Sequence, residues 1–111
     1  MLDIQDLETA GARVLQLTGR LDTNTSTVFD RHCAERVGLD ARVAVDLAAV
    51  DYVSSAGLRV FLMVAKKLQK GGGKLVLCGL APAVREVFDI AGFSRILDIA
   101  DDRGAALAKL A

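Results

Sequence analysis

The sequence predicts a single α/β domain in which a small, mixed and mostly parallel sheet of four to five strands is layered with about four helices. Three observations support this fold class. The length of 111 residues is that of one domain, so we expect a single domain over residues 1–111. The content of 52% hydrophobic and 25% charged residues is typical of a globular chain. Short apolar runs also alternate with amphipathic segments, which indicates strands joined by helices.

In the first half of the chain, residues 2–7 and 13–18 are expected to form two extended segments joined by a turn at Gly11. Hydroxyl side chains over residues 23–27 favour a helix start, because they accept hydrogen bonds from free backbone N–H groups. Apolar residues then recur every four positions, on one helical face that ends at a glycine: Phe29, Cys33, Val37 and Gly38. The apolar, β-branched run over residues 43–47 predicts a buried strand.

The second half continues the alternation. A long helix is predicted from a stripe of apolar residues at helical spacing: Leu58, Phe61, Leu62, Ala65 and Leu68. The glycines at 71–73 end it, and residues 74–78 form the next strand. Pro82 suits the first turn of a helix, whose predicted core face comprises Val84, Val87, Phe88 and Ala91. Residues 96–99 predict a last strand and residues 101–110 a last helix.

Polar residues follow two of the predicted strands, in segments that we expect to be loops over residues 19–23 and 51–57. In largely parallel sheets, binding sites collect beyond the carboxyl ends of the strands. If the strands over 13–18 and 43–47 are neighbours, these two loops meet at one edge of the sheet.

The charge balance and the cysteines limit the functional class. The 14 basic and 14 acidic side chains cancel, so no long-range field favours binding to nucleic acid or to an anionic membrane. Cys33 and Cys78 lie in apolar stretches and are expected to be free buried thiols, which suits a reducing compartment. Residues 1–6 do not resemble a signal peptide, and no apolar run approaches the length of a membrane span. We therefore expect a cytoplasmic protein.

The residues that enzymes commonly use do not occur in usable arrangements. The one histidine, His32, falls on the first predicted helix, and no glycine-flanked nucleophile turn accompanies Ser54 or Ser55. His32, Cys33 and Cys78 lack the paired spacing of a zinc site. No glycine signature of a nucleotide-binding loop is present. We expect a protein that is not an enzyme and that holds no metal or cofactor.

A response-regulator receiver has a similar length and alternation. Its magnesium site needs an acidic pair after the first strand, but the segment here offers only Asp22. Asp46 lies inside a predicted strand, and no lysine follows Ile99. The sequence therefore disfavours a receiver.

Ser55 stands at the predicted start of the long helix, and two interpretations apply to it. Ser54 or Ser55 can simply cap the helix. A hydroxyl at this position is also a suitable phosphorylation point, because helix-end N–H groups accommodate an anion. The added charge of about −1.5 to −2 would be resisted at an apolar partner surface. Val60 and Met63 are expected on the polar side of this helix near Arg59, where they would form a small contact patch.

Several segments together resemble the STAS domain of anti-sigma factor antagonists. The strongest match covers residues 43–60, with Asp46-Leu47 followed by Val53-Ser54-Ser55-Ala56-Gly57-Leu58-Arg59-Val60. Further matches occur in order along nearly the whole chain: Leu17-Thr18-Gly19-Arg20-Leu21-Asp22, residues 72–78, Pro82-Ala83-Val84, Phe88 and Gly92. The resemblance implies the STAS fold, a small sheet layered with helices.

The resemblance also implies the site. The family's phosphorylated serine maps to Ser55, with Ser54 as the alternative acceptor, and no residue is catalytic. The implied partner-binding residues are Asp22, Thr23, Asp51, Ser54, Gly57, Arg59, Val60 and Met63. For Asp46 we expect a structural role, in which its carboxylate accepts backbone N–H bonds from a loop.

The function implied by the resemblance is partner switching in transcription regulation by a phosphoprotein. The unphosphorylated antagonist binds an anti-sigma factor of the serine kinase type and releases the sigma factor; phosphorylation ends the binding, and a PP2C-type phosphatase restores it. The resemblance implies no direct contact with nucleic acid or membrane. It is compatible with a homodimer. The alternative is a non-catalytic STAS subunit of a lipid-transport ABC complex, which would bind its ATPase constitutively.

Overall fold

A computed structural model describes residues 1–9 and 11–111. The elements within this part of the chain follow one another in the order β1 (Leu2–Thr9), β2 (Ala12–Leu21), α1 (Thr23–Arg36), β3 (Arg42–Val53), α2 (Ser55–Lys70), β4 (Lys74–Cys78), α3 (Pro82–Ile90), η1 (Phe93–Arg95), β5 (Asp98–Ala100) and α4 (Arg103–Leu110). The order confirms the predicted α/β alternation.

The five strands of the described residues form one sheet in the order β1-β2-β3-β4-β5. β1 and β2 are antiparallel, whereas the pairs β2–β3, β3–β4 and β4–β5 are parallel. The sheet is therefore mixed and mostly parallel, as the sequence predicts. β2 and β3 are direct neighbours, with Leu15 opposite Val45. The carboxyl ends of these two strands consequently meet at one edge of the sheet.

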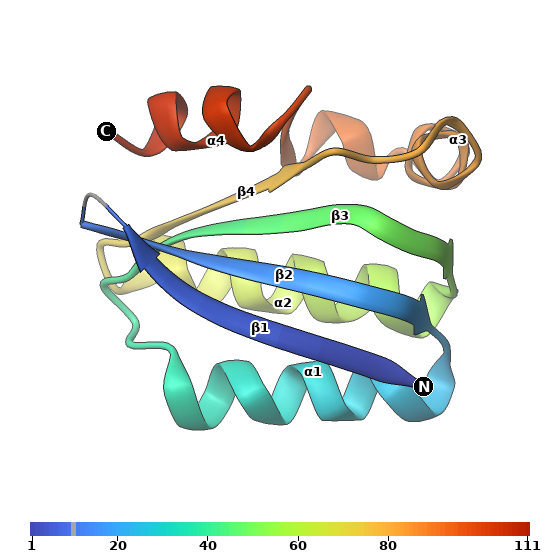
Figure 1. The fold of residues 1–111 in the computed structure, drawn as a ribbon, viewed down its shortest axis with the longest axis horizontal. Coiled ribbons are helices and arrows are strands. Elements are labelled where there is room, and N and C mark those ends of the chain that lie inside the picture. The colour runs from blue at the N-terminus through green and yellow to red at the C-terminus, as the bar shows by residue number, and fades with distance from the viewer. Residues whose placement is uncertain (10) are drawn as a thin grey trace.

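Helices α1 and α2 cover one face of the sheet, and α4 lies on the opposite face (Figure 1). The main core lies on the α1 and α2 side, where Phe29, Phe61 and Phe88 are fully buried. The ring centroids of Phe29 and Phe61 are 5.3 Å apart, and those of Phe61 and Phe88 are 6.0 Å apart. A smaller core under α4 uses mostly short side chains, among them Ala44, Ala100 and Ala106. These contacts fix both helix layers relative to the strands that carry the site.

Two strands extend further than the sequence analysis predicts. β2 continues to Leu21 and β3 to Val53, so residues 51–53 belong to a strand and not to a loop. The physical reason is that the two strands continue to pair with each other beyond the apolar runs. Arg20 pairs with Tyr52 and Leu21 with Val53, after two irregularities in the register. The last strand begins later than predicted, at Asp98, because residues 93–95 form a short 3₁₀ helix.

The buried face of α2 also differs from the predicted stripe. Leu58, Phe61 and Leu68 are buried as expected, but Val60 and Val64 are buried as well. The expectation that Val60 faces solvent is therefore wrong, since only 8% of its surface is exposed, whereas Met63 is 37% exposed. A helix covered by the sheet on one side and by α1 on the other buries a wider arc than a single stripe.

On α3, Val84 and Phe88 are buried as predicted, but Val87 and Ala91 are not. Cys33 and Cys78 are free and buried, which confirms the prediction. Burial raises the pKa of Cys33 to about 12 and that of Cys78 to about 11, so both thiols stay protonated at neutral pH.

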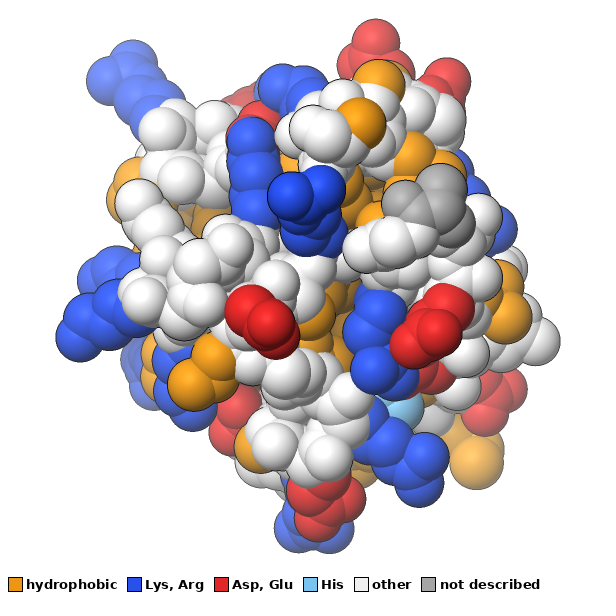
Figure 2. Space-filling view, turned by 90° about the vertical axis from the view of Figure 1, so that its left-hand side faces the viewer, with side chains coloured by type: hydrophobic (Ala, Val, Ile, Leu, Met, Phe, Trp, Pro, Cys, Tyr) orange, Lys and Arg blue, Asp and Glu red, His pale blue; other side chains and the backbone are white. Residues whose placement is uncertain are grey.

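The surface mixes both signs of charge. Figure 2 shows Lys and Arg side chains interspersed with Asp and Glu on the face at the left of Figure 1. This pattern agrees with equal numbers of basic and acidic residues. In the part of the chain that the structure describes, no helix combines the length and the apolar character that a bilayer crossing needs.

Candidate phosphorylation and docking site

The N-termini of α1 and α2 lie side by side at the carboxyl edge of β2 and β3. The backbone N–H of Ser54 donates to the carbonyl oxygen of Leu21 at 2.8 Å, which ties the end of one strand to the start of the second helix. Gly57, in the first turn of α2, is buried and lies against Leu21 and Val53. Because Gly57 has no side chain, α2 begins close to the sheet. The predicted meeting of the two segments is therefore confirmed.

The start of α1 is a capping box centred on Asp22. The Asp22 Oδ1 atom accepts the backbone N–H groups of Asn24 at 3.0 Å and Thr25 at 2.9 Å. In return, the Asp22 N–H donates to the Thr25 hydroxyl, which itself donates to the Arg20 carbonyl at 2.8 Å. The Thr25 N–H is the main cause that holds the pKa of Asp22 below its ordinary value, and Arg20 adds to this lowering. Asp22 therefore stays ionised and fixes the corner between β2 and α1.

The two serines at the start of α2 have different environments. Ser54 is the N-cap and half-buried, and its hydroxyl accepts the Gly57 N–H at 3.3 Å. Ser55 is the first residue of α2 and is exposed. Capping by Ser54 therefore leaves the Ser55 hydroxyl free of that structural role. The capping interpretation therefore applies to Ser54.

The other predicted site residues divide into two groups. Thr23, Asp51, Arg59 and Met63 are exposed, in positions where another molecule can reach them. Val60 is buried in the core and does not belong to an exposed contact patch. Within the described residues, no hydrogen bond joins Asp51 to either serine.

Sequence analysis missed two exposed residues at the same edge, Arg20 and Tyr52. They are directly opposite each other on β2 and β3, and the Arg20 Cζ atom lies 4.7 Å from the centre of the Tyr52 ring. The signal that could have found them is their position two residues before Asp22 and Ser54. That signal needs strands that continue past residues 18 and 47, which the apolar pattern does not indicate.

Asp46 has a structural role, but its backbone partner belongs to β3 itself and not to a loop as expected. Its Oδ1 atom accepts the backbone N–H of Ala48 at 3.0 Å. Its Oδ2 atom pairs with Arg103 of α4 at 2.9 Å, and Arg103 also donates to Gln16 at 3.0 Å. This network joins α4 to β2 and β3, so Asp46 positions α4 and does not take part in the exposed site.

His32 likewise has a structural partner. Its Nε2 atom lies 2.9 Å from Asp6 Oδ2, and Arg13 donates to both oxygens of the same carboxylate at 2.6 and 3.1 Å. Burial alone would raise the pKa of Asp6, but the hydrogen bonds from Arg13 and His32 outweigh it and hold that pKa below its ordinary value. The cluster clamps edge strand β1 to β2 and α1.

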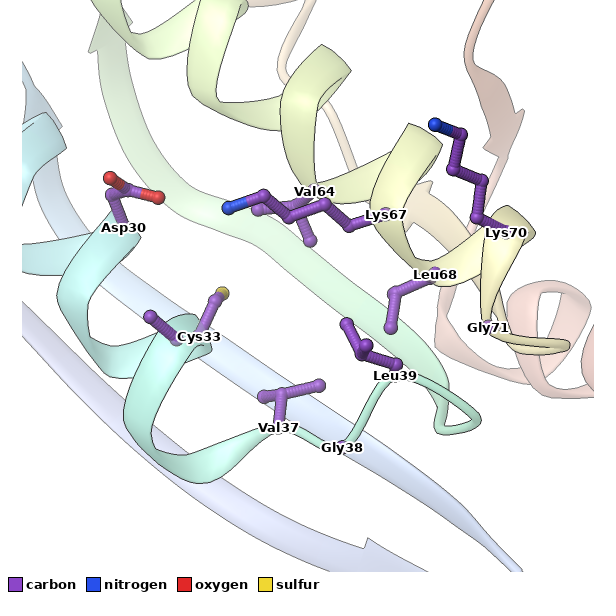
Figure 3. A pocket seen from close by; sticks show the side chains of 11 residues that line it. Asp30, Cys33, Val37, Gly38, Leu39, Val64, Lys67, Leu68, Lys70 and Gly71 are labelled. Atoms are coloured by element: carbon purple, nitrogen blue, oxygen red, sulfur yellow. The ribbon is translucent and has the colours of Figure 1, made fainter.

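A groove of about 630 Å³ opens between the C-terminal halves of α1 and α2 (Figure 3). Its floor is apolar and includes Val37, Val64 and Leu68, and the Lys67 side chain extends across it toward Asp30. The lining holds one acidic side chain, Asp30 in the middle of α1, and two basic ones, Lys67 and Lys70 at the C-terminal end of α2, so no class of ligand is favoured there. The groove lies at the opposite end of α2 from Ser55.

The exposed edge presents side chains that another macromolecule can reach. The described residues contain no cluster of three or more His, Cys, Asp or Glu side chains that could hold a metal ion. No buried side-chain nitrogen or oxygen among them lacks a hydrogen-bond partner. What the edge offers is the exposed hydroxyls of Thr23 and Ser55 at the starts of α1 and α2, beside exposed polar and aromatic side chains.

Comparison with known proteins identifies the family. The model of the STAS domain family matches residues 3–106, and the chain belongs to this family. A candidate anti-sigma factor antagonist of Bordetella bronchiseptica, BtrV, is 56% identical over 99 residues, which cover 88% of this chain and 85% of that protein. An anti-sigma-B factor antagonist of Bacillus subtilis is 31% identical over 85 residues, covering 77% of this chain and 78% of that protein.

Solved structures share the fold. The Bacillus cell fate determinant SpoIIAA in its phosphorylated form superposes with a TM-score of 0.71 at 19% identity, over 98% of this chain and 100% of that chain. The chain is thus a STAS domain protein, similar in sequence to proteins named as anti-sigma factor antagonists.

Proposed function

We propose that this protein is an anti-sigma factor antagonist that is switched off by phosphorylation of Ser55. The observation that carries the proposal is the division of roles between the two serines. Ser54 caps α2 and is half-buried, whereas Ser55 is exposed at the first helical position. A kinase can reach the Ser55 hydroxyl without removing the cap that stabilises the helix.

The site also accommodates the phosphorylated state. A phosphate on Ser55 would lie at the N-terminus of a helix whose free N–H groups and dipole favour negative charge. The domain therefore keeps its fold when it is modified. A partner surface that had buried Ser55 would instead have to desolvate about −1.5 to −2 charges, which costs several kcal/mol when they are unpaired.

The proposed partners follow from the relatives. Proteins similar in sequence are named as anti-sigma factor antagonists, which supports an anti-sigma factor as the binding partner. A protein of the same fold is known in a phosphorylated form. We propose that the anti-sigma factor is a serine kinase that modifies Ser55, and that a PP2C-type phosphatase reverses the modification. The exposed residues Thr23, Asp51, Arg59 and Met63 would surround the contact.

The experiment is phosphorylation of the purified chain by the kinase-type anti-sigma factor of the same organism, followed by intact-mass spectrometry. Wild type and Ser54→Ala should each gain one phosphate, and Ser55→Ala should gain none. Ser55→Ala should still bind the kinase and release its sigma factor, whereas Ser55→Glu should not. Phosphorylation of Ser55→Ala to the wild-type level would overturn the assignment. Binding that is equal for all variants would indicate a permanent adaptor, such as a subunit of an ABC complex.

A further inference from the structure

Arg20 and Tyr52 form an exposed pair on the sheet beside the proposed switch. We propose that this pair is a preorganised anchor that binds a carboxylate side chain of the kinase-type anti-sigma factor. The inference rests on the proposed function and adds to it a contact that decides which partner is accepted. The proposal commits to one occupant, an Asp or Glu side chain on the surface of that partner.

The geometry of the pair supports this role. The guanidinium carbon of Arg20 lies 4.7 Å from the centre of the Tyr52 ring, a distance at which a cation and an aromatic face attract each other. Both side chains remain accessible, since 53% of the Arg20 side chain and 44% of Tyr52 are exposed. The ring thus holds the guanidinium in place while its N–H groups face solvent. Little side-chain entropy is then lost when a partner binds.

The guanidinium N–H groups of Arg20 donate no side-chain hydrogen bond within the described residues. Its one ion pair within the described residues joins Arg20 Nε to Asp22 Oδ2 at 3.7 Å, which is longer than a hydrogen bond. The other oxygen of Asp22 is occupied by the backbone N–H groups that start α1. Asp22 therefore attracts the Arg20 guanidinium from one side but accepts no hydrogen bond from it. The planar fork of donors that remains matches a carboxylate, which it can bind through two parallel hydrogen bonds.

The backbone beneath the pair is fixed. The carbonyl of Arg20 accepts the Thr25 hydroxyl at 2.8 Å, and the next residue, Leu21, accepts the Ser54 N–H at 2.8 Å. Arg20 is therefore rigidly placed relative to Ser54, the cap immediately before Ser55. A partner that covers Ser55 is positioned to cover this pair as well, so the two contacts belong to one continuous surface. Tyr and Arg are also the residue types most often found to dominate binding energy at protein interfaces.

The test measures, by calorimetry, the dissociation constant between the unphosphorylated chain and the kinase-type anti-sigma factor of the same organism. Arg20→Glu should weaken binding by about 100-fold or more, because it removes the fork and opposes the partner's charge. Arg20→Lys should weaken it about 10-fold, since it keeps the charge but loses the planar fork. Tyr52→Leu should weaken it by a similar factor, because the guanidinium is no longer held.

The control is Arg36→Glu, which reverses an exposed charge at the far end of α1. It should bind within about threefold of wild type. Each variant is first checked for an unchanged thermal unfolding transition. A charge-reversal scan of the partner's acidic residues to Lys should find one position that restores binding of Arg20→Glu.

Three outcomes would overturn the inference: binding of Arg20→Glu as tight as wild type, equal losses for Arg20→Glu and Arg36→Glu, and a scan in which no reversal restores binding. If Ser55→Glu loses binding while the Arg20 variants keep it, the anchor is wrong and the proposed function stands. If the wild-type chain binds no kinase in either phosphorylation state, both proposals fall.

Discussion

Gly57 packs against Leu21 so closely that a methyl group at Gly57 would lie 3.2 Å from the Leu21 Cβ and 3.1 Å from the Val53 Cγ1. Leu21 and Val53 belong to the buried core and end the two strands that carry the site. The start of α2 is therefore set by contact with these strand ends. The position of Ser55 depends on this packing, because Ser55 lies two residues before Gly57.

The first prediction concerns this contact. Gly57→Ala should lower the free energy of unfolding by about 1 kcal/mol, because crowding in the core outweighs the better helix propensity of alanine. Gly104→Ala in α4 is the matched control, since its nearest neighbour would lie at an ordinary 3.5 Å. The control should gain up to about 1 kcal/mol. Urea unfolding measures both; equal stabilisation by the two substitutions would contradict the close contact.

The second prediction separates the two serines by stability. Ser54→Ala should cost about 1 kcal/mol, because the Gly57 N–H loses the hydroxyl that it donates to. Ser55→Ala should change stability by less than about 0.5 kcal/mol, because the exposed hydroxyl caps nothing. Thermal unfolding of the two variants beside wild type provides the measurement. A larger loss in Ser55→Ala would mean that the caps are assigned the wrong way round.

The third prediction concerns the pair that holds α4. Asp46 is 13% exposed at its side chain and Arg103 37%, so the pair is partly shielded from water. Removing Asp46 also frees the Ala48 N–H, so Asp46→Ala should cost about 2 kcal/mol. A double-mutant cycle with Arg103→Ala should give a coupling of about 1 kcal/mol.

The control for this cycle is the exposed pair of Arg85 and Asp89, which lie 3.2 Å apart on one helix. Its coupling should be about 0.3–0.5 kcal/mol. Equal couplings in the two cycles would show that burial adds nothing to the Asp46–Arg103 pair.

The fourth prediction is a pH dependence that arises from Asp6. Its pKa is lowered in the folded chain from an ordinary value of 3.8, so its ionised form stabilises the fold above that value. This contribution is lost as the pH falls from about 4 through the lowered folded pKa. In Asp6→Asn, stability at pH 7 should fall by on the order of 1 kcal/mol, and the stability difference from wild type should shrink as the pH falls below about 4. Unfolding curves of both proteins from pH 7 to pH 2 test this prediction. A stability difference that does not change with pH would contradict the stabilising role of the Asp6 carboxylate.

The sequence predicts the order of the strands only indirectly, but it predicts the edge of the sheet at which the carboxyl ends of β2 and β3 meet. The apolar runs at residues 13–18 and 43–47 mark the strands that become neighbours, and the hydroxyls that follow mark both helix starts. These features are local, because capping and alternation depend on residues close in the chain. They predict where both helices begin, although the cap of α1 is the Asp22 carboxylate and not one of the hydroxyls over residues 23–27.

What the sequence could not predict depends on contacts between distant segments. β3 continues through the polar residues Asp51 and Tyr52 because β2 pairs with them, and an apolar pattern does not report such pairing. Val60 is buried because its side of α2 is also covered, which a single-stripe pattern does not predict. The Arg20–Tyr52 pair follows from the same cause, because its members meet only when both strands extend to the edge.

The measurement that tests the central claim most directly is the affinity of the kinase-type anti-sigma factor for two forms of one preparation, bare and phosphorylated at Ser55. Buried, unpaired phosphate charge should weaken the complex by about 100-fold or more, equivalent to about 2.7 kcal/mol. Dephosphorylation of the same sample should restore the original dissociation constant. Equal dissociation constants for the two forms would contradict the switch.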